Sequence, residues 1–453
     1  MSTDALNPHI FRAYDIRGRA DRDLGDPVIA RIARAYGTYL RRRDKRRIAL
    51  SRDCRLSSDR IHAAMLDGLL ACGLDVLDIG VGPTPLLYFA THHFALDGGI
   101  QITGSHNPAE DNGLKPLCGR QSLAGDAIQE LRQMAEQGDF IASERGRVEA
   151  LDAVPAYVGY VRGNLQLSRT DLRFAVDAGN GAGGPLALRV MHALGLVPDP
   201  LYCDMDGRFP NHHPDPSDPA NLAALIARVR EREYEFGIAY DGDADRLGVV
   251  DAQGDIVWGD RLMILLARSI LERHPGAAIL GEVKCSQTLY DDIAAHGGRP
   301  IIWKTGHSLI KQKMKDEHAL LAGEMSGHLF YADRYYGFDD AIYASLRLLE
   351  LLADEERSLS EMLAELPRTF VTPEIRFDCP DDRKFDVVRR VLDHYRHADV
   401  LDIDGVRIRF PGGWGLVRAS NTQAALVMRF EADTTERLAA LRAEVEGVVA
   451  RSA

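Results

Sequence analysis

The chain has 453 residues, of which 45% are hydrophobic and 27% are charged, and its formal net charge is −12. The length predicts roughly three domains at about 150 residues each, and the composition is that of a soluble globular protein. The acidic balance argues against a general nucleic-acid binder, which carries a basic surface.

Three further absences narrow the class of protein. No apolar run approaches the ~20 residues that span a bilayer, and the N-terminus lacks the apolar segment of a signal peptide. The six cysteines are scattered and form no C-x-x-C pair, which argues against both a disulfide framework and a zinc site. We therefore expect a cytoplasmic protein that binds neither membrane nor nucleic acid.

Strand-like and helix-like segments alternate along most of the chain. The expected strands are 48–51, 76–79, 100–103, 174–177, 236–240, 278–283, 301–303 and 320–322. The expected helices are 28–40, 60–72, 185–194, 222–231, 260–272, 287–296, 310–317 and 340–352. The basic run at 41–47 is interpreted as the solvated end of the first helix rather than as a nucleic-acid patch, because cations favour helix C-termini. Such alternation predicts α/β domains with mixed, largely parallel sheets.

The pattern changes after Pro367. Shorter β-type runs follow at 371–377, 406–410, 415–417 and 425–430, with helices near 383–395 and 434–449. We interpret this part as a separate α+β domain. The expected domains are 1–150, 151–253, 254–367 and 368–453.

The first polar loop with possible chemistry follows the strand that ends at Thr103. In TGSHNP, Ser105 stands on a structured loop, and Asn112-Gly113 predicts a turn that returns Lys115 toward it. A hydroxyl facing an ammonium group is a possible phosphoryl site, and a desolvated basic environment would lower the pKa of Lys115. There is no G-x-S-x-G elbow, and His106 is expected to point awkwardly for a triad. The alternative is a serine that only hydrogen-bonds its own loop.

The most informative stretch is DGDADR, which follows a β-type run. Asp241, Asp243 and Asp245 repel one another unless a cation lies between them, so they predict a hard divalent ion. An EF-hand is rejected because loop positions six and twelve are Arg246 and Ala252. Three protein carboxylates with room for an outside oxygen favour Mg²⁺, and the alternative is a solvated acidic turn.

Two later loops carry groups that suit a phosphosugar. GEMSGH offers Glu324 and Ser326 to sugar hydroxyls, and its glycines permit close approach of the backbone. RASNT combines one arginine fork with hydroxyl and amide groups, which suits a phosphate dianion. Its residues are Arg418, Ser420, Asn421 and Thr422. The residues left open between a surface and a site role are Tyr14, Arg17, Arg246, Lys284, His307 and His328.

Taken together and in this order, the motifs resemble the α-D-phosphohexomutase family, and within it the bacterial phosphomannomutase/phosphoglucomutase enzymes. The resemblance runs from FRAYDIRG near residue 11 through TGSHNP, DGDADR and GEMSGH to RASNT, so it covers nearly the whole chain. Ala109 and Leu114 depart from a proline and an aromatic residue that are common in the family. The resemblance implies a heart-shaped molecule of four domains, each contributing one loop to a central cleft.

The resemblance also implies the reaction. Hexose 1-phosphate and hexose 6-phosphate, of glucose or mannose, interconvert through phosphorylated Ser105 and a hexose 1,6-bisphosphate, with glucose 1,6-bisphosphate as activator. The implied catalytic residues are Ser105, His106, Lys115, Arg246, His307 and His328. The implied Mg²⁺ ligands are Ser105, Asp241, Asp243 and Asp245. The implied substrate-binding residues are Tyr14, Arg17, Lys284, His307, Glu324, Ser326, His328, Arg418, Ser420, Asn421 and Thr422.

Small phosphosugars are the expected partners, and the expected state is a monomer, with a dimer as the alternative. A phosphoglucosamine mutase is the nearest rival. Proteins of that type usually have Gln where Met325 stands and a different lead-in to the serine than Thr103-Gly104, so glucose and mannose phosphates are favoured. A non-catalytic phosphosugar-binding protein would have lost one of the key residues, and a metal-dependent phosphatase would release free phosphate.

Overall fold

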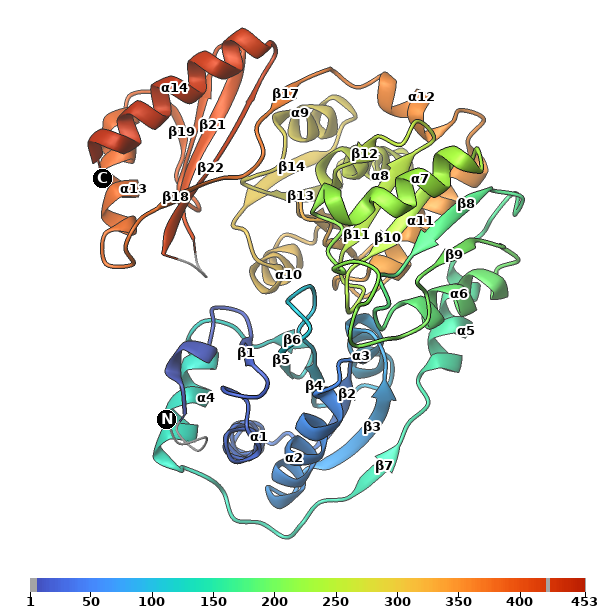
Figure 1. Ribbon diagram of the computed structural model, residues 1–453, viewed down its shortest axis with the longest axis vertical. Coiled ribbons are helices and arrows are strands. Elements are labelled where there is room, and N and C mark those ends of the chain that lie inside the picture. Colours follow the sequence, from blue (N-terminus) through green and yellow to red (C-terminus); the bar gives the residue numbers. More distant parts are fainter. Residues whose placement is uncertain (1–5, 421–423, 453) are drawn as a thin grey trace. The chain divides into compact units, whose positions relative to one another are not determined.

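The structure is a computed structural model that describes residues 6–420 and 424–452 (Figure 1). Its contacts divide the chain into two compact units. The first contains the residues up to Leu262 together with Ser326–Glu361, and the second contains Met263–Met325 and the residues from Met362 onward. Within the described ranges, no helix combines the length and the apolar character needed to cross a membrane.

The N-terminal part of the first unit is a sheet with helices packed on it. The strands are β1 (Ile16–Arg19), β2 (Arg47–Arg52), β3 (Asp75–Val81), β4 (Gly98–Ile102), β5 (Asp111–Cys118), β6 (Gln121–Ser122) and β7 (Val148–Ala150). The helices are the short 3-10 helix η1 (Pro8–Ile10), α1 (Asp26–Arg41), α2 (Ser58–Ala71), α3 (Thr84–His93) and α4 (Asp126–Gln137). The strand order is β1-β5-β4-β2-β3-β7, with β6 paired to β5. The predicted parallel pairing holds for β2 with β3 and β4, whereas β5 is antiparallel to β1 and β4.

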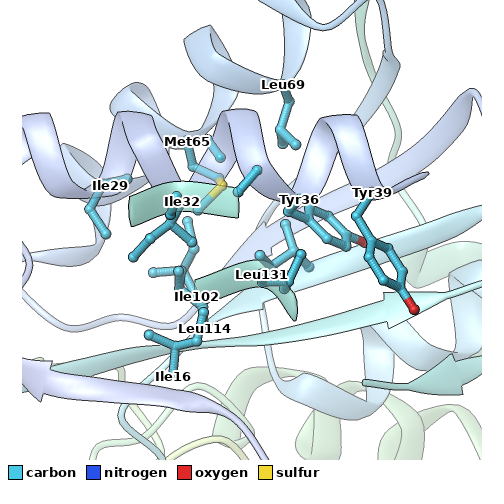
Figure 2. Packing of buried hydrophobic residues seen from close by; sticks show 14 of the residues in the cluster. Ile16, Ile29, Ile32, Tyr36, Tyr39, Met65, Leu69, Ile102, Leu114 and Leu131 are labelled. Carbon is cyan, nitrogen blue, oxygen red and sulfur yellow. The ribbon is translucent and has the colours of Figure 1, made fainter. Parts of the chain in front are cut away.

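The core of this part is built on the helical period of α1. Ile29, Ile32 and Tyr36 recur at spacings of three and four residues, so they share the face that packs on α2 and the sheet. Figure 2 shows these side chains beside Met65 of α2 and Ile102 of β4. The apolar stripe therefore fixes how α1 lies on the strands that carry the polar loops.

The basic run that follows α1 is the solvated helix end that the sequence predicts. Arg42 pairs with Asp139 at 2.7 Å, and Arg43 pairs with Glu130 at 3.2 Å. The side chains of both arginines are more than a third exposed, so these pairs contribute little to stability. Because carboxylates already neutralise this run, it offers no strong field for nucleic acid.

The predicted turn at Asn112-Gly113 was wrong. Both residues lie inside β5, which is paired with β1 on one side and β4 on the other. The chain reverses earlier, in the loop between Ile102 and Asp111. An Asn-Gly pair favours a turn because both residues tolerate positive φ. Here the pair lies in a strand instead, because tertiary packing determines its conformation.

Gly113 permits the close approach of two strands. A Cβ at this position would lie 2.5 Å from the carbonyl oxygen of Ile16, so a larger residue would push β1 away from β5. The predicted return of Lys115 is nevertheless confirmed, because the pairing of β4 with β5 places Lys115 opposite Gln101.

The rest of the first unit is a second sheet with its own helices. The elements are α5 (Val154–Asn164), β8 (Phe174–Asp177), α6 (Gly184–Ala193), β9 (Asp199–Leu201), the 3-10 helix η2 (Pro219–Leu222), α7 (Ala223–Glu231), β10 (Phe236–Tyr240), β11 (Leu247–Asp251), β12 (Ile256–Val257) and α11 (Ala341–Asp354). The residues of β16 (Leu329–Tyr331) also belong to this unit, but β16 is not a strand of this sheet. The strand order is β12-β11-β10-β8-β9. β10 is parallel to β8 and antiparallel to β11, so the acidic motif forms the connection between two adjacent buried strands.

The second unit begins with three parallel strands. Its elements here are β13 (Ala278–Glu282), α9 (Gln287–Ala295), β14 (Arg299–Trp303), α10 (His307–Asp316) and β15 (Leu321–Gly323), while α8 (Gly259–Arg273) and α12 (Leu359–Ala364) join the two units. β13 lies between β14 and β15 and is parallel to both, as the strand–helix alternation predicts.

The C-terminal part of the second unit is an antiparallel sheet with two helices. The elements are β17 (Phe370–Val371), β18 (Ile375–Asp378), α13 (Lys384–Tyr395), β19 (Asp399–Leu401), β20 (Val406–Phe410), β21 (Gly413–Ala419), β22 (Ala425–Ala432) and α14 (Thr435–Ser452). The order is β17-β22-β21-β20-β19, with β18 also paired to β22. The run expected at 371–377 divides into β17 and β18 around Pro373, which has no N–H for the ladder. The predicted fold class, three α/β domains followed by an α+β domain, is confirmed, and the central cleft stays a prediction.

One buried hydroxyl joins the strands that carry the serine loop, and its removal is testable. The Tyr36 hydroxyl lies 2.8 Å from the carbonyl oxygen of Gly99 in β4 and 2.5 Å from that of Leu117 in β5, and these two acceptors share its single proton. In Tyr36→Phe the two buried carbonyl oxygens lose this donor. The free energy of the local unfolding that exposes the β4 and β5 amides to hydrogen exchange should therefore fall by about 1–3 kcal/mol. Hydrogen exchange followed by mass spectrometry measures this loss peptide by peptide.

The matched control is Tyr39→Phe, on the same helix. The ring of Tyr39 lies under the guanidinium of Arg43 and keeps that contact without its hydroxyl. Its effect should stay below about 0.5 kcal/mol. Equal loss in the two variants would contradict the assignment of the stabilisation to the Tyr36 hydroxyl.

Candidate active site

The serine loop joins β4 to β5 and holds Ser105 in an uncommon conformation. The φ of Ser105 is +50°, in the left-handed region that few residues other than glycine adopt. Its N–H donates to the Thr103 hydroxyl at 2.8 Å, and its own hydroxyl donates to Asp241 Oδ2 at 2.7 Å. Ser105 is only 2% exposed. Strain of this kind concentrates at functional sites because the surrounding structure must impose it.

The acid loop joins β10 to β11 and gathers the three predicted carboxylates. Asp241, Asp243 and Asp245 are at most 1% exposed, and their oxygen atoms lie within 4.8 Å of one another. Asp241 Oδ1 accepts the N–H groups of Asp245 and Arg246, at 3.0 and 3.1 Å. Burial and the two neighbouring carboxylates raise the pKa of Asp241 well above its usual value. This charge density is the condition under which a divalent cation binds.

The serine loop and the acid loop are in direct backbone contact. A Cβ on Gly242 would lie 2.3 Å from the carbonyl oxygen of Ser105, so only glycine fits at this position. The acid loop also rests on the segment before η2, because Gly242 N–H donates to the carbonyl of Pro214 at 3.2 Å. The spacing D-G-D in the motif therefore serves packing as well as ligand placement.

Lys115 of β5 is the cation that faces the carboxylates. Its Nζ donates to Asp243 Oδ2 at 2.7 Å and to Asp245 Oδ2 at 2.5 Å. Burial alone would lower the pKa of Lys115, but the two carboxylates raise it well above its usual value. The predicted lowered pKa was wrong, because the expectation assumed a basic environment and this one is acidic. Lys115 and His328 hold the pKa of Asp245 well below its usual range, although burial alone would raise it.

The prediction that His106 points awkwardly for a triad is confirmed, although the ring lies close to the serine. Its Nδ1 lies 3.0 Å from Ser105 Oγ. The same nitrogen is 3.9 Å from Asp241 Oδ2, so hydroxyl and carboxylate share one side of the ring and a Ser-His-Asp triad is not formed. Burial, with the nearby Arg246 and Arg17, lowers the pKa of His106 well below its usual value.

Arg246 and His328 also lie beside the acidic residues. Arg246 directly precedes β11, and His328 directly precedes β16. They form an isolated antiparallel bridge, and Arg246 Nε lies 3.4 Å from His328 Nε2. His328 Nε2 is 3.2 Å from Asp245 Oδ1, and Asp339 also lies within 4.8 Å of this pair. Ser326, two residues earlier, is half-buried. His328 is thus placed beside Asp245 and Asp339.

The N-terminal motif reaches the serine loop through Arg17. Its Nε donates to Asp15 Oδ2 at 2.6 Å, and its Nη1 donates to Asn107 Oδ1 at 2.9 Å. The Asp15 contact helps to raise the pKa of Arg17 against the effect of burial. Tyr14 is half-buried in the turn before β1. The structure therefore brings Arg17 of β1 into contact with the loop that carries Ser105.

The second unit contains a separate cluster around Lys284. Lys284 Nζ lies 3.6 Å from Glu282 Oε1 and 3.5 Å from Glu374 Oε2. Burial lowers the pKa of Lys284, but the two carboxylates outweigh it and the pKa is raised. Glu282 was not predicted from the sequence, although its position at the last residue of β13 is a signal for a site residue in a parallel sheet.

Glu282 and Glu324 each fix a loop through the backbone. Glu282 Oε1 accepts the N–H of Met325 at 3.1 Å, and Oε2 accepts the Thr305 hydroxyl at 2.5 Å. Glu324 Oε1 accepts the N–H of Gly306 at 2.7 Å, directly before His307, the first residue of α10. Glu324, expected to face sugar hydroxyls, is therefore also part of the framework that places His307.

Arg418 lies at the end of β21 and already has an anionic partner. Asp404 lies 3.1 Å from its guanidinium, and the same carboxylate accepts the N–H of Thr305 at 3.0 Å. Ser420 is buried, and its carbonyl accepts from Lys384 Nζ at 2.7 Å. Asn421 and Thr422, the other predicted phosphate contacts, lie outside the described residues. Asp404 was missed because a single aspartate in a turn is a common surface residue.

Two further buried residues of the first unit were missed. Thr84, at the start of α3, donates its hydroxyl to Asp243 Oδ2 and supports the acid loop from a different helix. Arg55 donates to the carbonyl of Ser105 at 2.8 Å. The sequence signal for Arg55 is weak, since S-R-D-C-R reads as an ordinary polar loop after a strand.

The chain matches a complete set of known domain models. The descriptions are Phosphoglucomutase/phosphomannomutase alpha/beta/alpha domain I for residues 8–142, domain II for 155–254 and domain III for 258–370. The C-terminal domain of the same family matches residues 374–448.

Known proteins of similar length align over nearly the whole chain. A phosphomannomutase/phosphoglucomutase of Pseudomonas aeruginosa is 44% identical over 435 residues, which cover 96% of this chain and 94% of that protein. A phosphoglucomutase of Neisseria meningitidis is 43% identical over 445 residues, covering 97% and 96%. The crystal structure of a phosphoglucomutase/phosphomannomutase family protein from Burkholderia thailandensis superposes with a TM-score of 0.94 at 40% identity, covering 99% and 98%.

The contact between the serine and acid loops predicts the effect of one added methyl group. In Gly242→Ala the new Cβ would clash with the Ser105 carbonyl, so the two loops must separate. We expect a loss of activity of about 100-fold, because displacements near 1 Å in a reacting site have effects of this size. Initial rates with saturating substrate measure it, and Gly163→Ala, where no atom lies within 4 Å of the new Cβ, is the control. Wild-type activity in Gly242→Ala would contradict the contact.

The segment under the acid loop predicts a pH dependence. His212 Nε2 lies 3.1 and 3.0 Å from the two oxygens of Asp177. Burial lowers the pKa of His212, but the hydrogen bond and charge of Asp177 raise it above its usual value. A raised folded-state pKa gives stability that is complete below about pH 6.5 and is lost as the pH rises through the folded-state pKa.

Thermal unfolding between about pH 6 and pH 9 tests this dependence. The difference in midpoint between wild type and His212→Gln should be largest at the acidic end and should shrink as the pH rises. Subtracting the unfolding midpoint of the variant from that of wild type cancels the effect of the other titrating groups. A difference that is constant over the range would show that the His212–Asp177 contact is not ionic.

Proposed function

This chain belongs to the phosphoglucomutase/phosphomannomutase family and is an enzyme that interconverts hexose phosphates, and on that premise we propose that phosphorylated Ser105 carries the transferred group. We assign the 1-phosphates and 6-phosphates of glucose and mannose as substrates. The observation that carries the proposal is the hydrogen bond of 2.7 Å between Ser105 Oγ and Asp241, inside the acidic cluster that Lys115 faces.

Ser105 suits a phosphoryl carrier because its surroundings can balance a dianion. Lys115 and Arg246 supply positive charge close to the acid loop, and Arg17 reaches the neighbouring residue Asn107. We assign Lys115 the neutralisation of phosphoryl charge rather than proton transfer, because two carboxylates hold it charged.

The acid loop fits a magnesium ion. Its donors are carboxylate oxygens, which Mg²⁺ prefers, and Asp243 Oδ1 is buried without a hydrogen-bond partner among the described residues. We assign Asp241, Asp243 and Asp245 as the protein ligands, with an oxygen of phosphorylated Ser105 beside them. Bound there, Mg²⁺ supplies neutralisation of charge on the phosphoryl oxygens.

The proposed transfer proceeds in two balanced steps. In the first, the bond from phosphorus to Ser105 Oγ breaks as a bond forms to the 6-hydroxyl of a hexose 1-phosphate, which gives the 1,6-bisphosphate. The bisphosphate then turns so that its other phosphate faces Ser105, and in the second step Ser105 Oγ takes the phosphoryl group from carbon 1, which releases the 6-phosphate. His106, with Nδ1 at 3.0 Å from Oγ, takes the serine proton in the second step and holds it until the next first step, when it protonates the departing Oγ. The proton of the 6-hydroxyl is assigned to His328, with His307 assisting, and it passes to the carbon-1 oxygen when that oxygen loses its phosphoryl group.

The remaining predicted residues are assigned to the bound sugar and its resting phosphate. Glu324 and Ser326 contact sugar hydroxyls, and Lys284 and Arg418 contact the phosphate that is not being transferred, with Ser420 beside Arg418. Tyr14 completes the sugar contacts. Support comes from the buried cationic groups of Lys284 and Arg418, each held by carboxylates that a phosphate can replace.

We further propose the domain limits 1–150, 151–253, 254–367 and 368–453, Mg²⁺ as cofactor and glucose 1,6-bisphosphate as activator. A bisphosphate activator follows from the mechanism, because a serine that has lost its phosphoryl group must receive one before the next turnover. The partners are small phosphosugars, and the protein is assigned as a cytoplasmic monomer.

The decisive test replaces the serine hydroxyl. Ser105→Ala should abolish phosphorylation of the protein by glucose 1,6-bisphosphate and lower turnover of glucose 1-phosphate and mannose 1-phosphate at least about 1000-fold, because the nucleophile is gone. Coupled assays with Mg²⁺ and a trace of bisphosphate measure turnover, and intact-mass spectrometry measures phosphorylation.

Ser269→Ala is the control, because that hydroxyl donates within its own helix to Leu266. Normal turnover in Ser105→Ala would sink the phosphoserine mechanism. If the wild type is phosphorylated on Ser105 but converts neither sugar phosphate, the substrate assignment fails, and glucosamine phosphate is the next substrate to assay.

A further inference from the structure

The guanidinium of Arg55 lies at the centre of the serine loop. Arg55 follows β2, and its side chain has no exposed surface. Its two terminal nitrogens donate to backbone carbonyl groups along the loop from β4 to β5. The acceptors are the carbonyls of Ser105 (2.8 Å), Asn107 (2.6 Å), Pro108 (2.5 Å) and Asp111 (2.9 Å). One side chain therefore binds the loop at four points.

Three of these carbonyls, those of Ser105, Asn107 and Pro108, lie outside the strands, whereas Asp111 begins β5. The Pro108 carbonyl also accepts the N–H of Asp111 at 3.0 Å. Buried carbonyls outside a ladder need a donor, and Arg55 supplies one to each. The guanidinium can satisfy four at once because its five N–H groups lie in one plane. A Cβ on Gly104 would lie 2.6 Å from the centre of the guanidinium, which shows how closely the loop is wrapped around it.

Asp53 holds Arg55 in place and contacts the same loop. Asp53 Oδ2 lies 3.2 Å from Arg55 Nε and accepts the N–H of Gly104 at 3.2 Å. Asp53 Oδ1 accepts the Ser58 hydroxyl at 2.6 Å, which ties the pair to α2. The ring of Phe209 lies 5.0 Å from the guanidinium. Asp53 thus balances the charge of Arg55, and several contacts together fix the position of its side chain.

We propose that Arg55 is a positioning residue for phosphoryl transfer, which fixes the left-handed backbone of Ser105 by binding the carbonyl groups of its loop. The inference rests on the proposed role of Ser105 as the phosphoryl carrier. A residue at φ +50° relaxes unless contacts hold it, and the Ser105 carbonyl is one of the four that Arg55 binds. Relaxation would move Oγ away from Asp241 without changing any ligand or substrate group.

The test compares Arg55→Ala, Arg55→Lys and the matched control Arg31→Ala. Arg31 also donates to two backbone carbonyls in the same unit, those of Ala135 and Glu136, away from the serine loop. The measurement is the rate at which glucose 1,6-bisphosphate phosphorylates Ser105, read by intact mass, with circular dichroism confirming that each variant is folded. We expect a loss of about 100-fold in Arg55→Ala, a smaller loss in Arg55→Lys and a rate near wild type in Arg31→Ala.

Chemical rescue separates positioning from general destabilisation. Millimolar guanidinium ion should restore part of the rate of Arg55→Ala, because it can occupy the vacated space and donate to the same carbonyls, while methylammonium should not. The concentration of Mg²⁺ for half-maximal rate should stay within about twofold of wild type, since the carboxylates are unchanged.

Each outcome decides the proposal. A folded Arg55→Ala that is phosphorylated at the wild-type rate overturns it, as does an equal loss in Arg31→Ala. If Arg55→Ala fails to fold, Arg55→Lys decides, and a wild-type rate in that variant overturns the proposal. If the wild type itself takes no phosphoryl group on Ser105, the proposed function fails, which is a separate result from any difference among the variants.

Discussion

The organisation of the first unit depends on the burial of three carboxylates within 4.8 Å of one another. Burying like charges is unfavourable unless cations or hydrogen-bond donors stabilise them. The elements around the acid loop must therefore supply such groups. β5 supplies Lys115, the start of α3 supplies the Thr84 hydroxyl, and the serine loop supplies Ser105. The reversal of the chain between β4 and β5 has its chemical reason in this need, because it returns an ammonium group to the acids.

In the second unit, single carboxylates are stabilised by cations and hydrogen-bond donors in the same way. Glu282 and Asp404 are each paired with a cation and also accept a hydrogen bond from the loop around Thr305. A carboxylate used in this way fixes a cationic side chain and a backbone segment at once. The cationic groups of Lys284 and Arg418 are therefore already oriented by protein carboxylates.

Most of the fold could be predicted from the sequence because its signals are local. The expected strands and helices correspond to observed elements from α1 to α14, since hydrophobic period and turn residues act over a few positions. The Asn112-Gly113 turn failed because a strand contact, invisible in the sequence, determines what that glycine does. The split of β17 from β18 followed from Pro373, a local signal that a longer β-type run concealed.

The candidate site was predictable where one motif carries several functional groups, as in DGDADR and TGSHNP. Residues such as Arg55 and Glu282 were missed because each is a single polar residue whose role depends on distant partners. The error in the pKa of Lys115 has the same origin. Its neighbours in space are Asp243 and Asp245, more than a hundred positions away along the chain. Sequence spacing identifies the groups, but only the fold determines the charge around each one.

The left-handed backbone at Ser105 also restricts which amino acid can stand at this position. Threonine has the same hydroxyl group, but its branched Cβ is poorly tolerated at positive φ, where it crowds the neighbouring carbonyl. Cysteine is less hindered, yet it would place a larger atom where Oγ now lies 2.7 Å from Asp241 Oδ2. The presence of serine is therefore a stereochemical consequence of the loop. A branched or larger side chain at this position would first require a different backbone conformation.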